Sequence, residues 1–144
     1  MHPMTDHFDA GSVISARYLK YDHQFDLGEL SFPGGTLRVS GFQALPGTAL
    51  RAHIRARDVS LMLSRPENTS VLNVFRGRII EACEEDGPQL DLLIDIGSPL
   101  VARVTRKSYH DLGLKIGTEV YAMIKAVAID RRNLGTSQWD VRGS

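Results

Sequence analysis

Apolar and polar residues alternate along two stretches of this chain, and the two stretches resemble each other. Residues 47–59 read GTALRAHIRARDV and residues 117–130 read GTEVYAMIKAVAID. At a constant offset (117 − 47 = 70) the Gly-Thr pairs match, and so do the alternate apolar positions. Those positions are Leu50, Ala52, Ile54 and Ala56 in the first copy and Val120, Ala122, Ile124 and Ala126 in the second. Alternation of period two predicts a β-strand with one face in a core, and the fixed offset indicates two similar units in tandem.

Further short strands are predicted around each copy. They cover residues 13–21, 27–32, 36–39, 58–63, 74–83, 90–96 and 100–104, and four of the connecting segments contain Gly and Pro. Residues 105–114 break the alternation and predict a short helix that begins after Thr105 and ends at Gly113. The fold class we expect is all-β with one short helix, in which two small OB-like β-barrel units follow each other.

The boundary between the two units is predicted in a polar, proline-containing segment. We expect a disordered lead-in at residues 1–11, a first unit at 12–64, a second unit at 69–130 and a polar tail at 131–144. The openings of the units align as Ser12-Val13 with Ser70-Val71, at an offset of 58 (70 − 12 = 58). Because a unit of roughly 60 residues buries a small fraction of its surface, we expect the units to pack on each other or on a second chain.

Composition narrows the possible partners. The chain has 144 residues, with 17 basic and 17 acidic side chains and a formal net charge of zero. Broad binding of nucleic acid needs a strongly basic surface, so none is expected, although a small local anion site is compatible with this balance. The single cysteine, Cys83, excludes an intrachain disulfide and fits a reducing compartment. The sequence contains neither an apolar run of the roughly 18 residues that a membrane helix needs nor a signal peptide.

No arrangement typical of catalysis or of a metal centre is present in the sequence. The five histidines have no metal-ligand spacing with a Cys, Asp or Glu partner, and the acidic residues 84–86 precede Gly-Pro in what reads as a solvated turn. The sequence contains no nucleophile elbow and no G-x-x-x-x-G-K-[ST] P-loop. We therefore predict no catalytic residue and no metal ligand, and we expect Cys83 to pack in the barrel.

Three segments have the side chains that a small anion would need. Ser70 precedes the first strand of the second unit, Thr105 and Ser108 begin the predicted helix, and Lys125 lies on the second face of the repeated strand. Hydroxyls, free N–H groups and one ammonium suit a compact tetrahedral dianion. Each residue alone is explained as readily by a turn, a helix cap or a solvated strand position. Together they indicate an anion site, provided that the fold brings them together.

Several motifs in these segments resemble the molbindin or TOBE (transport-associated OB) domain. The resemblance is found in TSVLN at 69–73 with GRI at 77–79, ARVT at 102–105 with Ser108, LGL at 112–114 with Gly117, and YAMIKAV at 121–127. It covers most of residues 69–130. Residues 12–63, with IRARDVSL at 54–61, resemble the preceding half of the accessory region in the ATP-binding subunit of molybdate ABC importers.

The resemblance implies a site for molybdate or tungstate at a subunit interface, which regulates transport. Carried over by position, the ligand candidates are Ser70, Asn73, Thr105, Ser108, Lys125 and the backbone around Ala126. It further implies no covalently bound cofactor, molybdenum present only as an oxyanion, and a homodimer. The other implied partners are the ATPase domain of a longer chain and, through it, the membrane permease, at the cytoplasmic side of the membrane. In one departure, Leu72 stands where the molbindin pattern Ser-Ala-Arg-Asn has arginine.

Two alternatives remain open at this level. In the first, the chain is purely a structural dimerisation module of the ATPase subunit, with a degenerate ligand site. In the second, an OB-like barrel binds oligonucleotides, which requires exposed aromatic residues on a basic face. Tyr18, Tyr21 and Phe25 form the only aromatic cluster of that kind in this neutral chain, so the composition disfavours the second alternative.

Overall fold

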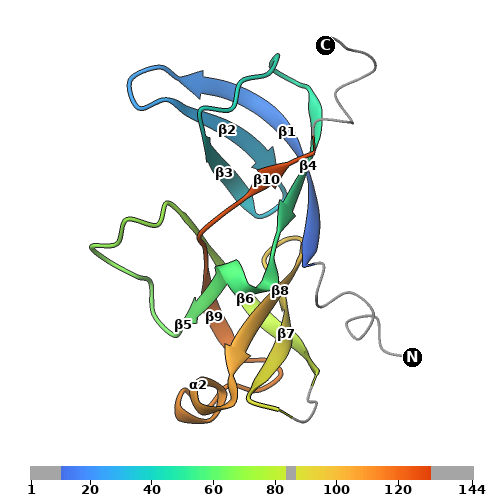
Figure 1. Ribbon diagram of the computed structural model, residues 1–144, viewed down its shortest axis with the longest axis vertical. Coiled ribbons are helices and arrows are strands. Elements are labelled where there is room, and N and C mark those ends of the chain that lie inside the picture. The colour runs from blue at the N-terminus through green and yellow to red at the C-terminus, as the bar shows by residue number, and fades with distance from the viewer. Residues whose placement is uncertain (1–10, 84–86, 131–144) are drawn as a thin grey trace.

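The computed structural model describes residues 11–83 and 87–130, which form strands at nearly all the predicted positions (Figure 1). The strands are β1 Ser12–Asp22, β2 Leu27–Phe32, β3 Gly35–Ser40, β4 Ala49–Ile54, β5 Val59–Met62, β6 Asn73–Cys83, β7 Gln89–Asp95, β8 Pro99–Thr105, β9 Glu119–Ile124 and β10 Ala128–Ile129. A 3₁₀ turn, η1, spans Ala56–Asp58, and the short helix α2 spans Arg106–Asp111. The predicted acidic turn, lead-in and polar tail lie largely or wholly outside the described residues.

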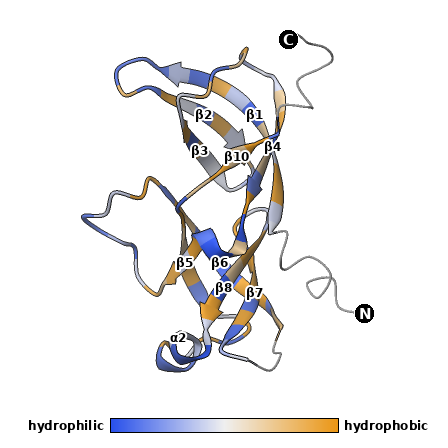
Figure 2. Cartoon of the chain, in the orientation of Figure 1, coloured by the Kyte–Doolittle hydropathy of each residue, from blue (hydrophilic) through white to orange (hydrophobic). Residues whose placement is uncertain are grey.

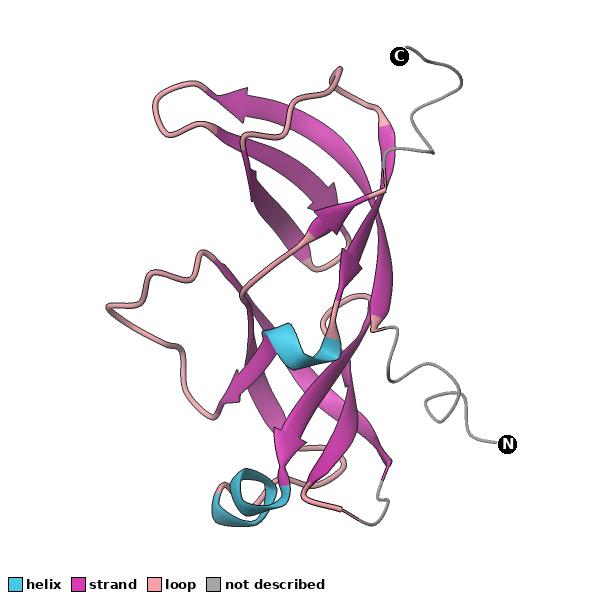
Figure 3. Ribbon diagram, in the orientation of Figure 1, coloured by secondary structure: helices cyan, strands magenta, loops and turns pink. Residues whose placement is uncertain are grey.

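Two five-stranded antiparallel sheets form the molecule, in the orders β10-β4-β1-β2-β3 and β5-β9-β6-β7-β8. Each sheet curls into a small OB-like unit, and the two units are stacked along the long axis of the molecule (Figures 1 and 3). The predicted fold class, all-β with one short helix and two tandem OB-like units, is confirmed. In β4 and β9 the apolar positions Leu50, Ala52, Val120 and Ala122 are buried as the alternation predicts.

The two units exchange one strand each, and the repeat in the sequence does not reveal this. Strand β5 follows β4 after only the η1 turn, yet it pairs with β9 in the second sheet, with Val59 opposite Ile124. Strand β10 follows β9 after a few residues and pairs with β4 in the first sheet, with Ile129 opposite Ala52. Hydrogen bonds between strands therefore cross the boundary that we predict at residues 65–69.

Strand registers relate the two units by a pseudo-twofold correspondence. Ser12 pairs with Ile54 in the first sheet, and Asn73 pairs with Ile124 in the second. Since the two isoleucines are 70 residues apart (124 − 54 = 70), Ser12 corresponds to Asn73 at an offset of 61 (73 − 12 = 61). The offset of 58 that we predicted for the openings of the units is therefore wrong, because the chain enters β6 three residues later than the serine match suggests.

One continuous core joins both sheets. Figure 2 shows hydrophobic positions distributed along the strands of both units, whereas α2 is mainly hydrophilic. Phe32 and Phe75, which come from different units, pack edge to face with ring centroids 5.0 Å apart. At the same contact, a Cβ on Gly34 would overlap the carbonyl oxygen of Ile96, so the β2–β3 turn lies directly on the β7–β8 turn. The prediction that the two units pack on each other is therefore confirmed.

Most local predictions hold in the second unit, and one is wrong. Thr105 caps α2, and Gly113 follows it with φ +64°, a left-handed conformation that suits glycine. Cys83 is buried, as expected. Ala126, which the alternation places on the buried face, is exposed because β9 ends at Ile124 and the chain then crosses towards the first unit. Trp139, which belongs to the predicted polar tail, lies outside the described residues.

Candidate functional site

Three of the six predicted ligand residues line a single cavity at the junction of the two units. The cavity has a volume of about 250 Å³, and Ser70, Asn73 and Lys125 contribute to its lining. Arg38 and Ser40 of β3 and the apolar Leu72 also line it. Liquid water occupies about 30 Å³ per molecule, so the cavity has room for a small anion together with bridging water. We refer to it as the junction cavity.

Thr105 and Ser108, two further predicted ligands, lie elsewhere. The backbone N–H of Ser108 donates to Thr105 Oγ1 at 3.0 Å, and the two hydroxyl oxygens are 3.1 Å apart. Thr105 pairs with Gln89 at the start of β7, which lies beside the end of β6. Lys125 instead follows Ile124 of β9, which pairs with Asn73 at the start of β6. The α2 cap and the junction cavity are therefore separated by the length of β6 within one chain, and α2 lies at one end of the molecule (Figure 1).

Asn73 has a structural role at the base of the junction cavity. Its side-chain amide accepts a hydrogen bond from the Arg38 backbone N–H at 2.8 Å and donates to the Arg38 carbonyl oxygen at 3.0 Å. The side chain is buried and takes the place of a strand partner for β3, so it joins the first unit to the second. At the corresponding position, the hydroxyl of Ser12 accepts a hydrogen bond from the Val101 backbone N–H at 2.8 Å.

The backbone of Lys125 is held by a hydrogen bond where the two exchanged segments meet. Its backbone N–H donates to the carbonyl oxygen of Asp58 at 2.8 Å, and its side chain is exposed. Ser70 is also exposed, in a turn shaped by the hydrogen bond from the Val71 N–H to Thr69 Oγ1 at 3.1 Å. Ala126 follows Lys125 in the chain but does not line the junction cavity.

The charge lining the junction cavity is positive. Arg38 and Lys125 contribute two cations, and none of the described residues that line the cavity is acidic. Such a lining attracts small anions, since nothing in it opposes their charge. Sequence reasoning missed Arg38 and Ser40, because they belong to an ordinary alternating strand and reach the cavity only through the contact between units. The one available signal was the cation at Arg38, on the polar face of that strand.

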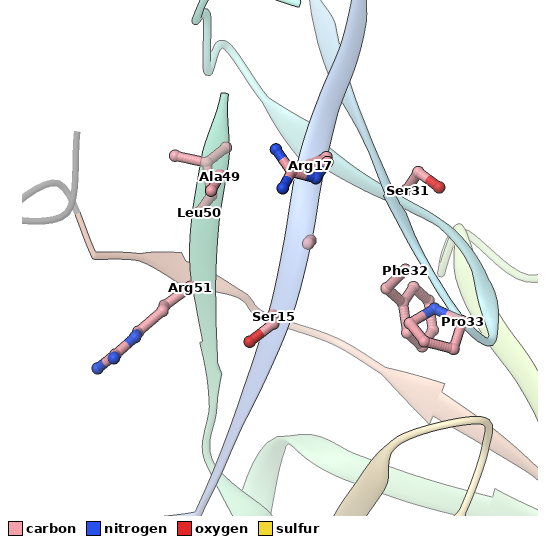
Figure 4. Close-up of a pocket in the computed structure, with 9 residues that line it drawn as sticks. Ser15, Arg17, Ser31, Phe32, Pro33, Ala49, Leu50 and Arg51 are labelled. Atoms are coloured by element: carbon pink, nitrogen blue, oxygen red, sulfur yellow. The ribbon is translucent and has the colours of Figure 1, made fainter. Parts of the chain in front are cut away.

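A larger cavity on the outer face of the first sheet carries none of the predicted residues. It has a volume of about 640 Å³, and Ser15, Arg17, Ser31 and Arg51 provide its polar groups (Figure 4). Arg51 extends away from β4 in this view, and Arg17 Nη1 donates to the Gly47 carbonyl oxygen at 2.9 Å. We take the smaller junction cavity as the candidate site because it gathers hydroxyls and cations from both units.

On the outer face of the second sheet, two arginines already pair with a carboxylate. Arg76 Nη2 lies 2.6 Å from Glu119 Oε1, and Arg78 Nη2 lies 3.1 Å from Glu119 Oε2. The hydrogen bond from Arg76, followed by that from Arg78, lowers the pKa of Glu119 below its usual value. Since these cations already have an anionic partner, this face is a poorer candidate for an external anion.

Other kinds of site find no support in residues 11–83 and 87–130. No cluster of three or more His, Cys, Asp or Glu side chains in that part of the chain could hold a metal ion. None of its helices has the length and apolar character required to cross a membrane.

Comparison with known proteins finds a family match for the second unit. Residues 69–130 match the family described as the TOBE domain. This stretch of the chain is therefore similar to TOBE domains. The match begins after β5, so the matching stretch of sequence lacks one strand of the second sheet. That strand comes from the preceding part of the chain.

The relatives that match most of this chain are longer proteins named as molybdenum import ATP-binding proteins. The molybdenum import ATP-binding protein ModC 1 of Azotobacter vinelandii is 42% identical over 129 residues, which cover 88% of this chain and 36% of that protein. The molybdenum import ATP-binding protein ModC of Methylococcus capsulatus is 42% identical over 123 residues, or 84% of this chain and 35% of that protein. This chain thus spans about a third of the length of these relatives and extends to both sides of the TOBE domain.

A solved structure shares the fold of the two units. It is the cytoplasmic molybdate-binding protein ModG with molybdate bound, which superimposes with a TM-score of 0.63 at 21% identity. The superposition covers 82% of this chain and 94% of ModG. At this identity the likeness concerns the fold, and it supports the tandem arrangement of two OB-like units.

Proposed function

We propose that this chain is the oxyanion-binding accessory region of a molybdate importer's ATP-binding subunit. The anion is molybdate or tungstate, and its binding modulates transport. The observation that carries the proposal is the junction cavity, in which Ser70, Lys125 and Arg38 surround a space without an acidic lining residue among those described. The relatives named as molybdenum import ATP-binding proteins and the molybdate-bound ModG of similar fold support the choice of anion.

The site is completed at an interface between two copies of the chain. The junction cavity and the α2 cap each offer donors, but they lie at different places in one chain, so a second copy brings its Thr105 and Ser108 to the cavity. Leu112 and Ile116, which follow the cap, are 37% and 64% exposed. Exposed apolar side chains beside a polar site are typical of an interface.

The remaining proposed partners are those of the longer importer subunit to which this region would belong. The ATPase domain of the same longer chain receives the signal and passes it to the membrane permease, at the cytoplasmic side of the membrane. The region itself catalyses no reaction, holds no covalent cofactor and binds molybdenum only as the oxyanion. Nucleic acid is not a partner, in keeping with a net charge of zero.

Calorimetric titration of the purified chain with molybdate, tungstate and sulfate tests this function. We expect heat and saturation with molybdate and tungstate, at one anion per chain, and a dimer in sedimentation of the same sample. Sulfate is the matched control, because it has the same charge and shape but a smaller radius, and it should bind more weakly. Absence of binding by molybdate and tungstate to a folded dimer would refute the proposal.

A structural dimerisation module with a degenerate site is the second candidate. Leu72 favours it, because this apolar side chain lines the cavity and is 54% exposed. Under this alternative the chain forms the dimer with or without the anion, and the titration gives no heat. The two candidates therefore differ in the titration and agree in sedimentation.

A further inference from the structure

Arg38 and Ser40 line the junction cavity from β3 of the first unit, together with Ser70 and Lys125 of the second. We infer that Arg38 is a principal anion-binding residue of this cavity, that Ser40 assists it, and that together they bind a tetrahedral dianion. The inference rests on the proposed function and names residues for it that lie outside the TOBE domain. It makes the site a product of both units.

The backbone of Arg38 is fixed relative to the cavity. Both its N–H and its carbonyl oxygen bond to the buried amide of Asn73, at 2.8 and 3.0 Å, and Asn73 itself lines the cavity. The side chain of Arg38 therefore extends from a backbone that is held in place at the cavity wall. Because the backbone is already held, only the side chain of Arg38 has to be ordered when the ligand binds.

The guanidinium group supplies what the second unit lacks. Leu72 has no donor, whereas arginine presents a planar, permanently charged fork that can bond two oxygens of one anion. Neither Arg38 nor Lys125 forms an ion pair with a carboxylate among the described residues, so both charges are available to a ligand. A dianion between one cation from each unit would be neutralised without help from position 72.

The place in the second sheet that corresponds to this cavity wall has different side chains. Leu27 pairs with Ser40 in the first sheet, and the corresponding pair in the second sheet is Asp91 with Arg103. Asp91 is 2% exposed, and its Oδ1 lies 3.0 Å from Arg103 Nε. A buried carboxylate at this place repels an oxyanion and occupies the guanidinium group. The chain therefore has one such anion-binding site, at the junction cavity, although the two units have similar folds.

Titration of four variants of the full chain with molybdate tests the inference. They are Arg38→Gln, Arg38→Lys, Lys125→Gln and, as the control, Arg51→Gln, which removes an exposed arginine from the outer face of the same sheet. We expect Arg38→Gln to weaken binding about tenfold or more, Arg38→Lys to weaken it less, and Arg51→Gln to leave it within about twofold. Thermal unfolding of each variant confirms that it is folded.

The outcomes separate this inference from the proposed function. If the wild type binds no molybdate, both fail. If the wild type binds and Lys125→Gln weakens binding while Arg38→Gln does not, the proposed function stands and the role of Arg38 is refuted. If Arg38→Gln does not fold, Arg38→Lys decides, because unchanged affinity in that variant would refute a contact through the planar guanidinium group. Saturation at two anions per chain would contradict the single position.

Discussion

Asn73 shows how one residue can serve both the fold and the site. The motif resemblance marked it as a ligand, and it does line the junction cavity, but its side-chain amide bonds to the backbone of Arg38. A buried amide that replaces a strand partner is costly to lose, because two backbone groups are left without partners. Its first contribution is therefore to hold the two units in register.

Replacing Asn73 tests this role. We expect Asn73→Ala to lower the free energy of unfolding by about 1–3 kcal/mol, since the N–H and carbonyl oxygen of Arg38 lose their partners. Urea unfolding followed by circular dichroism measures the change. Leu72→Ala, at the exposed neighbouring position, should change stability by no more than about 0.5 kcal/mol. Equal effects of the two substitutions would show that the Asn73 bridge contributes little.

The sequence brings predicted ligand residues together where neighbouring strands pair, but it does not reveal which residues meet across the two units. Ser70, Asn73 and Lys125 belong to neighbouring strand ends, and the pairing of β6 with β9 brings them together. Arg38 enters through a contact between units that no local pattern encodes. The roles of Thr105 and Ser108 stay predictions, because a second chain is needed to test them.

At the scale of elements, the strands were predictable and their partners were not. Alternation located β4, β5 and β9, because one face of each is buried. Alternation does not say which strand lies alongside, so the exchange of β5 and β10 was missed. The short η1 connection between β4 and β5 was a usable sign, since a strand that continues after so few residues has little room to turn back into its own sheet.

The contact between the two hairpin turns leaves no room for a side chain at Gly34. We expect Gly34→Ala to destabilise the protein by about 2 kcal/mol or more, because the new methyl group would overlap the Ile96 carbonyl oxygen and separate the units. Gly41→Ala is the control. Its site is open but has φ +68°, so it should cost only about 1–2 kcal/mol for the left-handed backbone. A smaller effect at Gly34 than at Gly41 in thermal unfolding would contradict this packing.

The ion pairs of Glu119 predict a dependence of stability on pH. Because Arg76 and Arg78 lower the pKa of Glu119 in the folded state, its contribution is complete above the usual pKa of glutamate and is lost as the pH falls through the lowered value. Glu119→Gln should therefore be slightly less stable than the wild type near neutral pH and equally stable in acid. Urea midpoints across this range measure the difference. It should vanish in an Arg76→Gln, Arg78→Gln background, and a difference that persists there would exclude the ion pairs as its cause.

At the scale of the whole molecule, strand exchange makes the two units one folding unit. The stretch that matches the TOBE family, residues 69–130, lacks β5, which completes its sheet and comes from the preceding segment. We expect a fragment of residues 69–130 to show no cooperative thermal unfolding. A fragment of residues 55–124, which contains every strand of the second sheet, should be measurably more stable. Equal stability of the two fragments in calorimetry would mean that β5 is dispensable.

The central claim is that both units together build one oxyanion site at their junction. Crystals of the chain grown with tungstate test it most directly, because tungsten is located by its anomalous scattering. The account predicts one tungsten peak per chain in the junction cavity, within hydrogen-bonding reach of Ser70 and Lys125 and facing Arg38, with Thr105 of a second copy closing the site. Tungsten bound at the outer face around Arg17 and Arg51, or no ordered tungsten at the junction in a folded dimer, would contradict it.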